Sequence, residues 1–182
     1  LTIPDVHFEV SKSILESRKH SYSEKPLSIK FEHGEELVNL GNSKGLHVGC
    51  APDTFLGAGI QEAKKIIDQN EIGKINLGSI SMGVAGHEIW HPNPDFYYKY
   101  GGGPILDMGP YYFTALVNLL GPAKNVFTQS RTVYQKRVIG SGDRQGQEIE
   151  VEIPTTLVSQ IEFESGALID SFFSFDVWFL FR

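Results

Sequence analysis

The chain has 182 residues, of which 41% are hydrophobic and 21% are charged, as is usual for a globular protein. Its net charge of −6 argues against a nucleic-acid-binding surface, because phosphate recognition requires clustered basic side chains. No apolar run is long enough to span a bilayer, and the single cysteine, Cys50, excludes an internal disulfide. These features favour a protein of the reducing cytoplasm without nucleic-acid or membrane partners.

Helical and extended patterns alternate over the first fifty residues. Apolar side chains have helical spacing over residues 7–18, and a second helix is predicted from Phe31 or Glu32 to about residue 43, before the stop signal Lys44-Gly45. Residues 21–23 and 46–50 have the character of strands, the second of them buried. This alternation predicts an α/β layer with parallel strands.

The pattern changes after Ala51-Pro52-Asp53, and the strands that follow are expected to pair largely antiparallel. Helices are predicted over residues 56–70 and 107–120, and strands over residues 74–84, 125–134, 155–163 and 167–175. Glu164-Ser165-Gly166 is a hairpin turn, and the polar residues 137–147 are expected to form a surface loop. The second part therefore predicts an α+β domain with an open, largely antiparallel sheet flanked by helices.

Both ends of the chain are apolar. Residues 1–4 resemble the end of a buried strand, and residues 177–182 form an apolar strand pattern without a polar tail. Exposed strand edges of this kind promote aggregation, so we expect a fragment of a longer protein that lacks a segment at each end.

A glycine-rich segment carries the strongest indication of a functional site. Gly101-Gly102-Gly103 allows a sharp turn and a close approach by another group, and it leads into Asp107 and Tyr111. If the following run is helical, the spacing of four residues places the carboxylate and the phenol on one face. The alternative is structural: Asp107 caps the helix, Tyr111 and Tyr112 fill the core, and the glycines form only a tight turn.

A second candidate segment is Glu24-Lys25-Pro26, which follows a predicted strand. Ligands of α/β layers bind beyond the carboxyl ends of the strands, where Lys25 can reach one. The residue before a proline is held away from helical angles, and the bond can be cis. The alternative is that Glu24 and Lys25 form a solvated surface pair beside an ordinary turn.

An aromatic, irregular loop covers residues 86–103. Its aromatic and histidine side chains, Trp90 and His91 among them, are candidate contacts for a ligand. Ordinary loop packing is the alternative. His87 and His91 are four residues apart, but a metal pair is not expected because the prolines nearby oppose a supporting helix.

These segments together resemble a known family. Glu24-Lys25-Pro26, Ile72-Gly73-Lys74, the glycine–aspartate motif of residues 101–109 and Leu119-Leu120-Gly121 occur in the order found in the glucose–fructose oxidoreductase, inositol dehydrogenase and dihydrodiol dehydrogenase (Gfo/Idh/MocA) family. The resemblance implies that residues 1–50 are the second half of a Rossmann-type dinucleotide-binding domain. It implies that residues 51–182 are a substrate-binding and oligomerisation domain, truncated at its C-terminus.

The resemblance also implies roles for single residues. Lys25, with Glu24 and Pro26, lies near the nicotinamide of NAD or NADP, and Asp107 lies in the pocket for a sugar, polyol or related hydroxy or carbonyl compound. Many members have a histidine as general acid/base where this chain has Tyr111, which agrees with the tyrosine-bearing branch. The implied catalytic residues are Lys25, Asp107 and Tyr111. Trp90, His91 and Tyr112 join Asp107 in contacting substrate, and no metal is expected.

The chemistry supports this assignment independently of the family. Hydride transfer at a carbinol carbon requires a proton to leave or join the oxygen, and a tyrosine can move it. A tyrosine ordinarily has a pKa of about 10, and a lysine ammonium within ~4–6 Å stabilises the phenolate. Lys25 is the candidate for that ammonium, which requires it to meet Tyr111 across one cleft. Asp107 would orient Lys25 or a substrate hydroxyl.

Other expectations concern binding partners. No Gly-x-Gly-x-x-Gly fingerprint is present, so we expect these 182 residues alone to bind nicotinamide dinucleotide poorly and to be inactive. A non-catalytic sugar-binding sensor or scaffold with the same fold is the alternative function. The sheet of the second domain is expected to form a homo-oligomer, and five aromatic residues are either interface or covered core: Phe163, Phe172, Phe173, Phe175 and Trp178.

Overall fold

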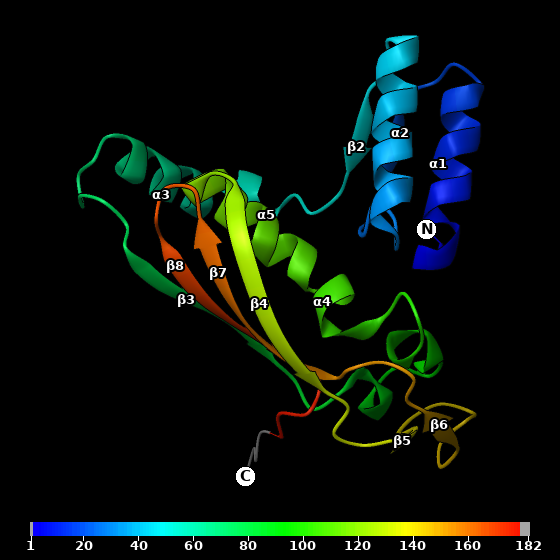
Figure 1. Ribbon diagram of the computed structural model, residues 1–182. Helices are drawn as coiled ribbons and strands as arrows, with labels where there is room; N and C mark the ends of the chain where they lie inside the picture. Colours follow the sequence, from blue (N-terminus) through cyan, green and yellow to red (C-terminus); the bar gives the residue numbers. More distant parts are fainter. Residues whose placement is uncertain (1, 179–182) are drawn as a thin grey trace. The chain divides into compact units, whose positions relative to one another are not determined.

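The computed structural model describes residues 2–178, which divide into two compact units, residues 2–53 and residues 54–178. Each unit has its own secondary structure and its own core (Figure 1). None of the helices within residues 2–178 is both long and apolar enough to cross a membrane.

The first unit is a small parallel α/β layer. Its elements in chain order are η1 (Pro4–Val6), α1 (His7–Glu16), β1 (Ser21–Ser23), α2 (Phe31–Lys44) and β2 (Val48–Cys50). β1 and β2 pair in parallel with Ser21 opposite Val48, which confirms the predicted alternation. Phe8, Leu15 and Leu37 are the buried residues that join the two helices. β2 is half-buried along its length rather than fully buried as predicted.

The helix boundaries of this unit follow local rules. α2 ends at Gly45, whose φ of 64° is the left-handed conformation that closes many helices, as the sequence predicts. Ile3, within the segment expected to end a buried strand, is 51% exposed and lies outside any strand. That expectation is therefore wrong for residues 2–4, and Leu1 lies outside the described residues.

The second unit is a four-stranded sheet with helices. Its elements in chain order are η2 (Thr54–Leu56), α3 (Ala58–Asp68), β3 (Leu77–Gly83), η3 (His87–Ile89), η4 (Asp95–Tyr98), α4 (Gly103–Asp107), α5 (Gly109–Leu120), β4 (Ala123–Arg131), β5 (Lys136–Val138), β6 (Glu148–Glu150), β7 (Thr156–Phe163) and β8 (Leu168–Ser174). The strand order is β3-β8-β7-β4. β7 pairs antiparallel with both β4 and β8, joined to β8 by the predicted hairpin.

The sheet is mixed, which corrects the expectation of a largely antiparallel sheet. β3 pairs with β8 in parallel, with Leu77 opposite Leu168. These strands are separated by some ninety residues, so no local turn signal could predict the direction in which they pair. The combination of helices with a mixed sheet is the fold class of this unit.

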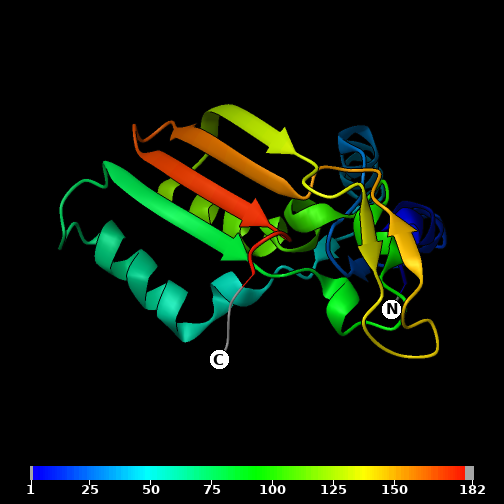
Figure 2. The ribbon, with the colours of Figure 1, turned by 90° about the horizontal axis from the view of Figure 1, so that it is seen from below.

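One face of the sheet is the core and the other is open. α5 packs on the inner face, where Leu116 contacts the buried Ile161, Phe163 and Ile169. α3 lies beside α5 on the same side (Figure 2). The outer face exposes four apolar side chains, one from each strand: Leu77, Phe127, Val158 and Leu168.

The aromatic residues of the last strands divide between these environments. Phe163, Phe173 and Phe175 are at most 2% exposed, so the alternative of a covered core holds for them. Phe172 points to the outer face and is half-buried. Trp178 is exposed but, like Val177, is not in a strand, and the rest of the strand predicted over residues 177–182 lies outside the described residues.

The predicted surface loop of residues 137–147 is partly structured. β5 and β6 form an antiparallel hairpin with Arg137 opposite Ile149. Arg137 is 4% exposed, which contradicts the expectation of a solvated polar segment. Figures 1 and 2 both show this hairpin at the end of the sheet where β3 and β8 terminate. The hairpin therefore packs where the aromatic loop leaves β3.

Candidate active site

The centre of the candidate site is a hydrogen-bonded pair formed by His87 and Asp107. Asp107 is the last residue of α4, and His87 is the first residue of η3. His87 Nε2 lies 3.0 Å from Asp107 Oδ2, and the two side chains are only 14% and 16% exposed. Sequence reasoning missed this partnership, because twenty residues separate the two and the spacing of His87 from His91 suggests only a metal pair.

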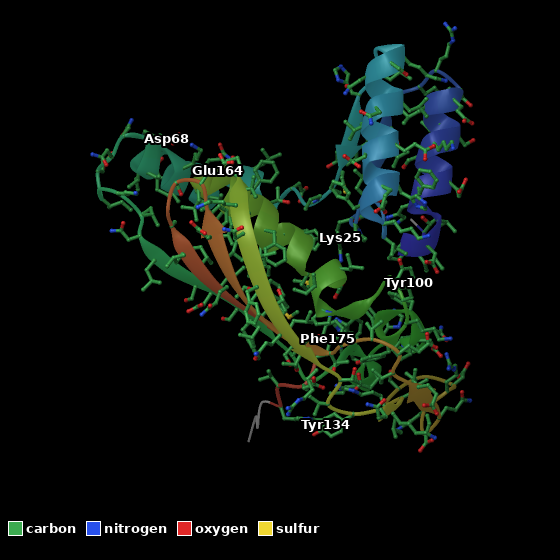
Figure 3. All side chains as sticks on the ribbon, in the orientation of Figure 1. Lys25, Asp68, Tyr100, Tyr134, Glu164 and Phe175 are labelled. Carbon is green, nitrogen blue, oxygen red and sulfur yellow. The ribbon has the colours of Figure 1, made fainter. Side chains whose placement is uncertain are left out.

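Aromatic rings surround the His87 imidazole. Its ring centroid lies 4.2 Å from that of Tyr97, 4.7 Å from that of Phe175 and 5.5 Å from that of Trp90. Figure 3 shows Phe175 just beyond the end of β8, where the loops gather. Burial, and after it the negative charge of Asp107, raises the pKa of Tyr97. Tyr97 is therefore a neutral phenol at physiological pH.

Trp90 and His91, the predicted substrate contacts, belong to the same cluster. Trp90 is 58% exposed, and its ring centroid lies 5.4 Å from that of His91. The backbone N–H of Asn93 donates to His91 Nδ1 over 3.1 Å. These contacts place Trp90 at the solvent side of the cluster and fix the ring of His91.

The segment between His87 and His91 is a helical turn, although an irregular loop was expected. The His91 N–H donates to the His87 carbonyl over 2.8 Å, and η3 and η4 lie within the same loop. The two rings nevertheless contact different partners, since His87 meets Asp107 and His91 meets Phe96. Among residues 2–178, no three His, Cys, Asp or Glu side chains are grouped as metal ligands.

The three glycines allow the chain to approach itself. A Cβ at Gly102 would lie 2.2 Å from the Phe96 carbonyl oxygen, so no larger residue fits there. Gly103 has a φ of 86°, which side-chain-bearing residues rarely adopt. The close approach inferred from the sequence is thus made by the aromatic loop, whose backbone packs on the start of α4.

Tyr111 and Tyr112 lie on α5, in the turn after Asp107. The predicted single helix is interrupted at Met108, so α4 begins four residues earlier than expected and α5 begins at Gly109. Asp107 ends α4, and neither helix has a side-chain N-cap, so the capping alternative is wrong. Tyr111 is half-buried, and the Tyr112 ring packs edge-on against Phe173 at 5.3 Å.

A buried network of hydrogen bonds and ion pairs holds the aromatic loop in place. Arg137 Nη1 donates to Glu88 Oε1 over 2.8 Å, and Arg137 also pairs with Asp176. The Tyr98 hydroxyl donates to Glu88 and accepts the N–H of His87 over 3.1 Å. The backbone of His87 is therefore held by a chain of hydrogen bonds that ends on Arg137.

The remaining predicted residues, Glu24, Lys25 and Pro26, lie in the first unit, directly after β1. The Lys25–Pro26 peptide bond is cis, and His7 Nδ1 lies 2.7 Å from the Pro26 carbonyl oxygen. The backbone N–H of Lys25 donates to Glu24 Oε2 over 3.3 Å. Lys25 thus lies in the segment that follows the carboxyl end of a parallel strand. Its meeting with Tyr111 of the second unit stays a prediction.

Comparisons with known proteins show what this chain is similar to. The chain is 28% identical over 165 residues to dTDP-3,4-didehydro-2,6-dideoxy-alpha-D-glucose 3-reductase of Saccharopolyspora spinosa, which covers 87% of this chain and 44% of the relative. It superposes on an NAD binding oxidoreductase of Klebsiella pneumoniae with a TM-score of 0.84 and 20% identity, covering 100% of this chain and 48% of the other.

A second similar structure was solved as a complex. The WlbA dehydrogenase of Bordetella pertussis, solved with NADH and UDP-GlcNAcA, superposes with a TM-score of 0.82 and 19% identity, covering 97% of this chain and 51% of the other. Because these two structures are only 20% and 19% identical to this chain, they show that the folds are alike and carry no conclusion about function. The chain spans less than half the length of the curated relatives it matches, 33% to 44%.

The family model described as the GFO/IDH/MocA C-terminal domain matches residues 60–180, which include β3, the aromatic loop, Asp107 and all the strands of the sheet. The match covers most of the chain and nearly all of the second unit. The chain therefore belongs to the GFO/IDH/MocA family.

Proposed function

We propose that the intact protein is an NAD(P)-dependent oxidoreductase that transfers a hydride between nicotinamide and a sugar, polyol or related hydroxy or carbonyl compound. The observation that carries the proposal is the family match over the segment that holds Asp107 in its pair with His87. The reductase of a dTDP-linked sugar and the dehydrogenase bound to NADH and UDP-GlcNAcA support a sugar-like substrate.

We assign the first unit to the dinucleotide and the second to the substrate. Glu24, Lys25 and Pro26 would lie beside the nicotinamide, since their turn follows the carboxyl end of β1, where α/β layers bind ligands. The bound cofactor would accept or supply the hydride. Asp107, Trp90, His91 and Tyr112 would line the substrate side.

Tyr111 is the proposed proton carrier. Oxidation of a carbinol releases a hydride from carbon and a proton from oxygen, and a tyrosine oxygen can take that proton. The Lys25 ammonium would stabilise the phenolate that receives it, and Asp107 would orient Lys25 or a substrate hydroxyl. The assignment accounts for a phenol four residues beyond the aspartate of the glycine motif.

Replacing Tyr111 with Phe in the intact protein tests the assignment. We expect the turnover number to fall by about 100-fold or more, because general acid–base catalysis contributes roughly 10²–10⁴-fold. Cofactor affinity, measured by NADH and NADPH fluorescence, should stay within about threefold. Tyr134→Phe is the matched control, since Tyr134 is 46% exposed and lies outside the proposed site. An unchanged turnover number for Tyr111→Phe would remove Tyr111 from the mechanism.

We also propose that the outer face of the sheet joins copies of the chain in a homo-oligomer. Four apolar side chains that are 50% to 73% exposed on adjacent strands support this: Leu77, Phe127, Val158 and Leu168. Light scattering of the intact protein should give an oligomer, and Val158→Lys should shift it towards monomer. A monomer in the wild type would reject the proposal.

A further inference from the structure

We propose that His87 is a positioning residue, which holds the Asp107 carboxylate in its working orientation by a hydrogen bond from Nε2. This inference rests on the proposed function, because the orientation of Asp107 matters for turnover only if Asp107 serves catalysis. The 3.0 Å contact between Nε2 and Oδ2 is the observation that carries it. Both groups are largely shielded from water, which strengthens a hydrogen bond to a charged acceptor.

The surroundings of His87 fix its ring on two sides. Tyr97 and Phe175 contact the imidazole at centroid distances of 4.2 and 4.7 Å, which limits its rotation. The backbone of His87 is held separately, because its N–H donates to the Tyr98 hydroxyl, itself bonded to the buried Glu88. A side chain fixed at both ring and backbone is suited to orient another group rather than to follow it.

The pair also has a defined hydrogen position. An ionised carboxylate accepts hydrogen bonds only, so His87 Nε2 must carry the hydrogen that points to Asp107. Asp107 ends the short helix α4, at the interruption before α5. A hydrogen bond from the loop therefore ties this carboxylate to a second element, and the pair links loop and helix.

Two substitutions of His87 separate the hydrogen bond from ring packing. His87→Phe keeps an aromatic ring against Tyr97 and Phe175 but removes the donor, whereas His87→Gln keeps an N–H near the Nε2 position and removes the ring. We expect His87→Phe to lower kcat of the intact enzyme by about 10- to 100-fold, the loss that corresponds to one hydrogen bond to a charged group. We expect His87→Gln to retain kcat within about threefold of the wild type.

Matched controls and a second readout make the test specific. His47→Phe and His47→Gln repeat the same exchanges at an exposed histidine before β2, and should leave kcat unchanged. Cofactor affinity should be the same in all variants. Nitrogen-15 NMR of the ligand-free wild type should show the Nε2–H form of His87, and this readout needs no turnover.

Three outcomes overturn the inference. Equal kcat for His87→Phe and the wild type would show that Asp107 needs no orienting bond. A loss in His87→Gln with none in His87→Phe would assign His87 to packing. An Nδ1–H form of the ligand-free imidazole would contradict the hydrogen bond. Absence of turnover in the wild type would reject the proposed function instead, while the NMR readout would still decide whether the pair forms.

Discussion

Two arginines of the β5–β6 hairpin, Arg137 and Arg144, each pair with a carboxylate of the aromatic loop, and the two contacts differ in burial. Arg137 pairs with Glu88 and Asp176, with side chains that are 3% to 6% exposed. Arg144 pairs with Asp95 at 2.6 Å, but these side chains are about one-third exposed, at 33% and 35%. The Arg137–Glu88 and Arg144–Asp95 contacts use the same chemistry and join the same two segments of the chain, while Asp176 follows β8.

The comparison shows that burial, rather than the type of contact, decides how much an ion pair contributes to stability. Water already solvates an exposed pair, so forming it gains little. A buried pair that loses one partner leaves an uncompensated charge in the interior, which is costly. The Arg137 guanidinium also contacts the rings of Tyr98 and Tyr134, at 5.3 Å from each centroid. We therefore expect Arg137 to hold the loop and Arg144 to limit its fraying.

The largest predicted effect is that of Arg137→Met. The substitution should lower the free energy of unfolding by about 3–5 kcal/mol, because Glu88 and Asp176 would stay buried without their cation. Chemical denaturation of the intact protein measures this loss, with Arg144→Met as the matched control. Equal losses for the two variants would show that burial does not distinguish the contacts.

Tyr98→Phe should have an intermediate effect, about 1–3 kcal/mol at neutral pH, since it removes the hydroxyl between Glu88 and the His87 N–H. Denaturation at pH 7 measures it. The control is Leu119→Val, which lies in the second unit outside this network and is not expected to alter the contacts described here. A loss below that of Arg144→Met would place Tyr98 outside the network that supports the loop.

The same tyrosine predicts how stability depends on alkaline pH. Burial, followed by the hydrogen bond to Glu88, raises the pKa of Tyr98 above its usual value of about 10. The stabilisation is complete below pH 10 and is lost as the pH rises above it, by about 1.36 kcal/mol per pH unit. Tyr98→Phe should remove this part of the slope. An equally steep decline in the variant would contradict the prediction.

The smallest effect is expected for Arg144→Gln, and it should appear in acid. The hydrogen bond from Arg144 holds the pKa of Asp95 below its usual value, so the pair stabilises the fold above about pH 4. That contribution disappears as the pH falls through the lowered pKa. The wild type should therefore lose more stability than the variant between about pH 4 and pH 2, and added salt should reduce the difference. Acid titration curves with the same slope for both proteins would refute this.

Local patterns were sufficient for most elements. The hydrophobic spacing predicted α1 and α2 within two residues at their ends, and Gly45 and the turn at residues 164–166 were correctly placed. The glycine motif by itself indicates Asp107 as a site residue. These features depend on neighbours in the sequence, such as a glycine at a helix end or apolar residues on one face.

Local sequence patterns could not predict contacts between segments that are distant in the sequence. The parallel contact of β3 with β8, the burial of Arg137 and the pairing of His87 with Asp107 each join segments separated by twenty or more residues. A charged residue in a glycine-rich segment resembles a solvated loop until a partner carboxylate is known. Sequence reasoning therefore placed Arg137 on the surface and missed the pairing of His87 with Asp107.

The sequence by itself determined most of the helices and strands, the family resemblance and the candidate residues Lys25, Asp107 and Tyr111, because periodicity, turn residues and motifs are local properties. Only the tertiary structure decided what those residues contact. It made the sheet mixed, interrupted the helix at Met108 and gave Asp107 a histidine partner. The physical reason is that packing and charge compensation in the interior depend on which distant segments meet.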